Sequence, residues 1–134
     1  MNYLKELCED LKIDTPLKKT ERESYFLPLN QSLSIVVKDL NQGFFFFSTL
    51  CPCPSIKQEE LFIQLMKANL FSQGTLGAVL AMAPDENYLT VSSALTYEMD
   101  YRTFKESLED FANIVEYWRE EVQRHVKQAQ EGIL

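Results

Sequence analysis

The chain has 134 residues, of which 46% are hydrophobic and 25% charged, a composition that excludes disorder as the main state and fits one domain over residues 1–134. The formal net charge at pH 7 is −7, so phosphate backbones and anionic membrane surfaces repel the chain. We therefore expect no nucleic-acid partner and no membrane insertion. A basic or neutral polypeptide suits the charge better, although simple solubility explains the charge equally well.

The N-terminal segment and the cysteines indicate a cytoplasmic protein. Lys5, Glu6, Glu9 and Asp10 interrupt any apolar run near the N-terminus, so we expect no secretory signal. The longest apolar block, residues 44–47, is far too short to cross a bilayer. Three cysteines are an odd number without framework spacing, which is typical of a reducing cytosol.

A first helix is predicted over residues 2–12, because apolar side chains recur there at spacings of three and four. These side chains are Leu4, Leu7, Cys8 and Leu11. Pro16 is expected to end the helix, since a proline pushes the residue before it out of helical geometry.

Three strands are predicted next, over residues 23–29, around 32–38, and over 44–50. The first two alternate apolar and polar side chains, so each is expected to bury one face. The third does not alternate, because its four consecutive phenylalanines put rings on both faces of the sheet. Either both faces are covered, or one face is left for a partner. Pro52 and Pro54 are expected to stop this strand.

The second half of the chain predicts a helix, a hairpin and a long helix. Ser55 and Gln58 form a capping-box pattern that opens a helix ending near Leu70. The hairpin strands are expected at 78–83 and 88–94. Asp100 is the expected N-cap of the last helix. Its apolar stripe is formed by Phe104, Leu108, Phe111, Val115, Trp118 and Val122, with Trp118 interpreted as a core residue, and beyond Val126 we expect a frayed end.

The predicted order is therefore α-β-β-β-α-β-β-α. This order favours an α+β domain. No repeat of 20 to 50 residues is visible, which argues against a helical-repeat protein.

The sequence offers little for catalysis. Its only histidine, His125, lies late in an acidic helix and is interpreted as a solvated surface residue. Cys8, Cys51, Cys53 and His125 would make four zinc ligands, but the Cys-x-Cys spacing is unusual and no second pair follows. We therefore predict no enzyme, no cofactor and no metal. The remaining candidate for function is apolar surface, which the phenylalanine run and the second helix supply beyond the needs of one core.

The segment from Leu65 to Trp118 resembles the class I chaperones of bacterial type III secretion, a Tir-chaperone-like family. The matching features are Ala68-Asn69-Leu70-Phe71 at the end of the second helix, the hairpin around residues 84–87, and Trp118-Arg119 in the last helix. Chain length and acidity match as well. The Cys51-Pro52-Cys53-Pro54 segment has no counterpart that we can place.

The resemblance implies an α+β sandwich with a mostly antiparallel, twisted sheet. It also implies a two-fold homodimer that holds an extended segment of a secreted effector. It implies dimer contacts at Leu61, Leu65, Met66 and Leu70, with the strand at 78–83 nearby. For the hydrophobic groove that binds the effector we predict Leu4, Leu7, Tyr25, Leu27, Phe44 and Phe46. An alternation error of one residue would move every strand position in this set to the other face.

Three functions are therefore weighed. The first is a cytoplasmic export chaperone in bacteria that binds the extended N-terminal segment of one or more effectors and keeps it competent for secretion, without catalysis. Its partners would be effectors and a second copy, with the secretion ATPase as a further candidate. The second is a dimeric peptide-binding adaptor that is not tied to secretion. The third is a small enzyme with a site across a dimer, which the lone histidine argues against.

Overall fold

The computed structural model describes residues 2–12, 18–21, 24–71, 77–85 and 87–132. They form an α+β domain of helices packed on an antiparallel sheet, so the predicted fold class is confirmed. The elements are α1 (Asn2–Asp10), β1 (Lys18–Glu21), β2 (Ser24–Pro28), β3 (Ser34–Asp39), β4 (Phe44–Pro52), α2 (Gln58–Phe71), β5 (Val79–Met82), β6 (Tyr88–Leu95) and α3 (Tyr101–Gln130).

The described strands form one six-stranded sheet in the order β1-β2-β3-β4-β6-β5. Every strand pairing in it is antiparallel. β1 was not predicted, because its sequence Lys-Lys-Thr-Glu shows no apolar alternation, and a register shift between Lys19 and Glu21 interrupts its pairing with β2. β1 and β5 are the two terminal strands, so they lie at opposite ends of the sheet.

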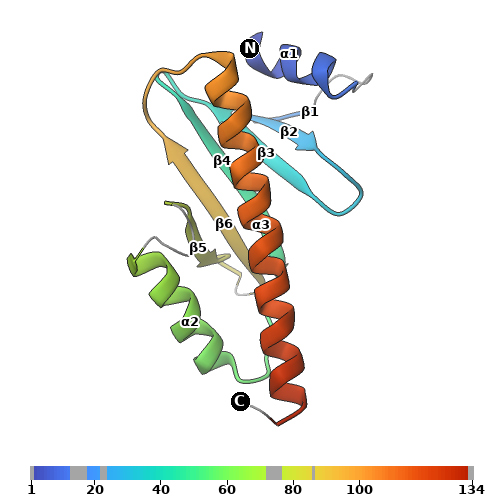
Figure 1. Cartoon of the computed structure of the whole chain (residues 1–134), viewed down its shortest axis with the longest axis vertical. Coiled ribbons are helices and arrows are strands. Elements are labelled where there is room, and N and C mark those ends of the chain that lie inside the picture. The colour runs from blue at the N-terminus through green and yellow to red at the C-terminus, as the bar shows by residue number, and fades with distance from the viewer. Residues whose placement is uncertain (1, 13–17, 22–23, 72–76, 86, 133–134) are drawn as a thin grey trace.

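Helix α3 covers one face of the sheet along most of its length, while α1 lies at the end that carries β1 and β2, and α2 lies beside β5 (Figure 1). The predicted apolar stripe of α3 is buried throughout, and Trp118 is 4% exposed, which confirms it as a core residue. The rings of Phe104 and Phe111 pack against Phe44 and Phe46 of β4. The core therefore lies between α3 and the centre of the sheet.

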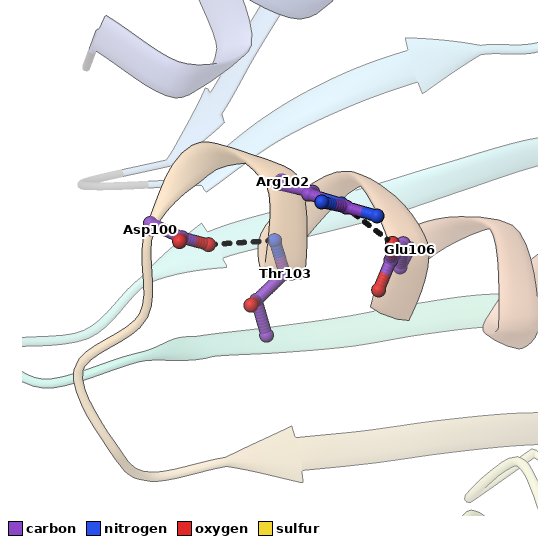
Figure 2. A network of polar contacts seen from close by, with 4 residues as sticks. All are labelled: Asp100, Arg102, Thr103 and Glu106. Carbon is purple, nitrogen blue, oxygen red and sulfur yellow. Dashed lines mark hydrogen bonds and ion pairs between the residues drawn. The ribbon is translucent and has the colours of Figure 1, made fainter.

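Asp100 caps α3 as predicted. Its carboxylate accepts a hydrogen bond from the backbone N–H of Thr103 at 2.8 Å, and Figure 2 shows this contact beside the exposed Arg102–Glu106 ion pair. The Thr103 N–H stabilises the charged carboxylate, so the pKa of Asp100 lies below its ordinary value. The cap fixes where α3 begins, after the connection that leads from β6.

The C-terminal part of α3 differs from the prediction. The helix does not fray beyond Val126 but continues to Gln130, with Ala129 buried. His125 is not a solvated residue: it is 4% exposed, and its Nε2 lies 3.0 Å from the carbonyl oxygen of Lys57. Val122, His125 and Ala129 continue the buried stripe, but histidine and alanine are too weakly apolar to extend it visibly in the sequence.

The connection from β4 to α2 also differs from the prediction. β4 extends through Pro52, because a register shift between Thr49 and Cys51 lets the proline join the strand without a ladder hydrogen bond. The predicted capping box is not formed, since the Gln58 side chain donates to the carbonyl of Pro54 at 3.1 Å rather than reaching back to Ser55.

Arg119 ties α3 to the far end of β4. Its guanidinium donates to three backbone carbonyl oxygens: Leu50 at 2.6 Å, Ser32 at 2.8 Å and Thr49 at 3.0 Å. Hydrogen bonds from a charged donor are stronger than neutral ones, so the bonds to Thr49 and Leu50 hold the register shift of β4 in place.

Candidate functional site

The six residues predicted for the effector groove come together in the structure, but inside the monomer. Leu4, Leu7, Leu27, Phe44 and Phe46 are buried, and Tyr25 is half-buried against the same core. They lie where α1, α3 and the covered face of the sheet meet. Because their side chains are covered here, a contact between them and a partner stays a prediction.

Three polar contacts hold α1 over this part of the core. The Tyr3 hydroxyl donates to the carbonyl of Met99 at 2.8 Å, and the Tyr101 hydroxyl donates to the carboxylate of Asp10 at 2.5 Å. Lys105 approaches the same carboxylate at 3.5 Å. The Tyr101 hydroxyl, helped by Lys105, lowers the pKa of Asp10. Desolvation, followed by the bond to Asp10, raises the pKa of Tyr101.

The opposite face of the sheet carries a second set of aromatic side chains. The strand registers place Phe26, Val36 and Phe47 in one row across β2, β3 and β4, with Phe45 in the next row. All four are half-buried, and none belongs to the core or to the side chains packed against it. The phenylalanine run of β4 therefore serves two faces: Phe44 and Phe46 point to α3, and Phe45 and Phe47 point away.

Helix α2 presents an exposed apolar surface. Of the four residues predicted for the dimer interface, Leu61 and Leu65 are buried, whereas Met66 is 68% exposed and Leu70 is 77% exposed. Ile63, which the sequence analysis did not single out, is 46% exposed beside them. Ile63, Met66 and Leu70 are called the α2 surface below. They line a shallow hollow of about 510 Å³ together with Lys67 and Asn69.

Asn69 joins α2 to the terminal strand of the sheet. Its Nδ2 donates to the carbonyl oxygen of Leu80 at 2.7 Å, and its Oδ1 accepts from the N–H of Leu80 at 2.8 Å. A second hollow of about 200 Å³ lies between α2 and β5, lined among others by Met66, Asn69 and Met82. The sequence placed Asn69 within a family motif but assigned it no role, because a polar residue on a helix carries no periodic signal.

The cysteines and the buried histidine do not form a metal centre in the structure. Among the described residues, no group of three or more His, Cys, Asp or Glu side chains is arranged to hold a metal ion. Cys8, Cys51 and Cys53 are free thiols. Burial raises the pKa of Cys51 to about 11, so this thiol is a poor nucleophile at neutral pH.

In the described part of the chain, no helix is both long and apolar enough to span a bilayer.

Comparison with known families gives a match over most of the chain. The sequence model of the Tir chaperone protein (CesT) family matches residues 2–119. The matched range contains every described element in full except the C-terminal part of α3. A sequence comparison with curated proteins finds no significant match.

Comparison with solved structures finds several similar folds. The ExsC–ExsE complex superposes with a TM-score of 0.71 at 13% identity, covering 89% of this chain and 90% of that chain. A chain of the HopA1–SchA chaperone–effector complex gives a TM-score of 0.61 at 14% identity, covering 88% and 94% of the two chains. YbjN from E. coli, a proposed transcription regulator, gives 0.55 at 18% identity, covering 85% and 87%. At these identities the likeness shows a shared fold.

Proposed function

The chain belongs to the Tir chaperone protein (CesT) family, and from this membership we propose that it is an export chaperone that binds effectors of a bacterial type III secretion system. The family match over residues 2–119 is the observation that carries the proposal. The family is one of chaperones, so the chain is not an enzyme.

The α2 surface supports a homodimer as the working form of this chaperone. Met66 and Leu70 are large apolar side chains that are exposed to solvent in the monomer, and Ile63 enlarges this apolar surface. A two-fold axis beside α2 would bring this surface against its own copy and remove all three from water. Leu61 and Leu65, which are buried, would then hold α2 on the domain. Met66 and Leu70 would contact the second copy.

The client proposed for this dimer is an extended N-terminal segment of an effector. Such a segment gains affinity from main-chain hydrogen bonds at a sheet edge and selectivity from side-chain pockets. We propose the outward row of Phe26, Val36 and Phe47 as its first apolar contact, because this row is reachable without any rearrangement. Contact with the predicted groove residues would require helices to move, because Leu4 is buried on α1 and Phe46 is covered by Phe104 and Phe111 of α3.

The remaining parts of the proposal follow from the same role. The complex would form in the bacterial cytoplasm, before export, and the secretion ATPase would be a candidate partner at the moment of release. A peptide-binding adaptor unconnected to secretion is the second candidate. The observation in its favour is the fold shared with YbjN, which is described as a regulator rather than a chaperone.

A pull-down from the native bacterium tests the proposal. The tagged chain should recover a secreted protein, and recovery should be lost when the N-terminal segment of that protein is deleted. Phe47→Asp should also abolish recovery, whereas Thr49→Asp, at an exposed position on the same face of β4, should not. Recovery of cytosolic proteins alone, by a bait that is folded, would favour the adaptor and contradict the export role.

A further inference from the structure

Strand β5 has one edge paired and one edge turned toward α2. Its register with β6 pairs Leu80 with Val91, and just beyond β5 the N–H of Ala83 donates to the carbonyl of Tyr88 at 2.8 Å. Backbone groups alternate between the two edges of a strand, so residues 79, 81 and 83 face β6 and residues 78, 80 and 82 face outward. Leu80 is therefore the middle position of the outward edge.

Asn69 occupies this middle position as a neighbouring strand would. A paired strand would offer Leu80 one carbonyl acceptor and one N–H donor, and the side-chain amide of Asn69 offers the same two groups at 2.8 and 2.7 Å. Asparagine is a poor helix former because its side chain competes for backbone groups. Its presence here, between the exposed apolar residues Met66 and Leu70, is explained by this contact.

We propose that Asn69 closes the β5 edge of the sheet against strand addition. An added strand would have to displace the amide from Leu80 before it could pair with three consecutive outward positions. Unpaired edges invite pairing with other chains, and natural sheets block them by covering or interrupting the edge. What this closure does for binding rests on the proposed function. A second copy would contact the α2 surface through side chains only. The client strand would be directed to β1, at the opposite end of the sheet.

The test compares Asn69→Ala with the wild type and with Asn113→Ala, which makes the same replacement at an exposed position of α3. Amide hydrogen exchange followed by NMR should show the Leu80 amide exchanging about tenfold faster in Asn69→Ala, with the amides paired between β4 and β6 unchanged. Light scattering over a concentration series should show species heavier than the wild type. Asn113→Ala should match the wild type in both measurements.

A rescue variant identifies the surface through which the heavier species form. Ala81→Lys places a charge on the β5 edge, and charged residues on edge strands oppose pairing. Asn69→Ala/Ala81→Lys should therefore return to the wild-type mass. Unchanged mass of a folded Asn69→Ala, a lighter species, or an unchanged Leu80 amide would each overturn the proposal. If Asn69→Ala does not fold, Asn69→Ser, which is too short to reach both Leu80 groups, is held to the same outcomes.

The wild-type mass is the baseline of this test. A monomeric wild type would contradict the proposed dimer, but the change of mass on replacing Asn69 would still decide whether the edge is closed. A failure of the dimer and a failure of the edge closure are thus distinguishable.

Discussion

Strand β4 and helix α2 both carry apolar side chains on two sides, but their outward sides differ in exposure. The outward phenylalanines of β4, Phe45 and Phe47, are half-buried rather than exposed, because neighbouring side chains of the sheet flank them. The outward residues of α2 have less cover, with Met66 at 68% and Leu70 at 77% exposed. The apolar surface with less cover gains more from burial, so α2 suits a permanent partner and the sheet face an exchangeable one.

The largest effect expected from this comparison separates the two faces of β4. Phe46 is fully buried against Phe104 and Phe111, so Phe46→Ala should lower the free energy of unfolding by about 3–5 kcal/mol. Phe47→Ala, the same replacement one residue later on the outward face, should cost less than about 1.5 kcal/mol. Urea unfolding of both variants measures the difference. Equal losses would show that something covers the outward face as fully as α3 covers the other.

The second prediction separates the two sides of α2 by assembly rather than by stability. Met66→Glu should convert the proposed dimer to a folded monomer, because it places a charge at the centre of the α2 surface. Leu65→Ala, on the buried side, should instead lower stability by about 2–5 kcal/mol. Light scattering and urea unfolding distinguish the two outcomes. Asn113→Glu adds the same charge to an exposed site on α3 and should change neither the mass nor the stability. A Met66→Glu variant that remains dimeric would exclude the α2 surface as the interface.

The sequence predicted the parts of the fold that rest on repeated apolar spacing. The apolar stripe of α3 places each side chain by its period alone, so Trp118 was assigned correctly to the core. β1 has no such period, and His125 extends a buried stripe with a polar side chain. β1 is defined by its pairing with β2, and His125 by a contact with the carbonyl of Lys57, 68 residues away in the sequence.

The candidate site was less predictable, because side-chain type does not reveal what covers a side chain. Four consecutive phenylalanines indicate two apolar faces of β4 but not which face α3 takes. On α2, Leu65 and Met66 are adjacent apolar residues, and only the position of the sheet decides that one is buried and the other exposed. Asn69 shows the same limit for a polar residue, since its partner lies in a strand 11 residues away.

The smallest expected effect concerns α1, which contacts Phe44 on the inward face of β4 through Tyr3. The Tyr101 hydroxyl and Lys105 lower the pKa of Asp10 in the folded state, so the unfolded chain binds a proton at higher pH than the folded chain does. The contact therefore stabilises the fold above the ordinary aspartate pKa, near 3.9, and this stabilisation is lost as the pH falls through the lower folded value. Asp10→Asn should lower stability at neutral pH, and its difference from the wild type should shrink as the pH falls below the ordinary aspartate pKa.

Urea unfolding at several pH values measures this difference, and Glu9→Gln supplies the control. Glu9 is an exposed carboxylate next to Asp10, but the Tyr101 hydroxyl bonds to Asp10 and not to it. Tyr101→Phe should reproduce the pH dependence of Asp10→Asn, because the hydroxyl is the largest cause of the lowered pKa. The same pH dependence in Glu9→Gln as in Asp10→Asn would mean that general charge, and not the Tyr101 contact, holds α1. In that case displacement of α1 by a client would cost less, and Phe44 of β4, which α1 contacts through Tyr3, would become easier to reach.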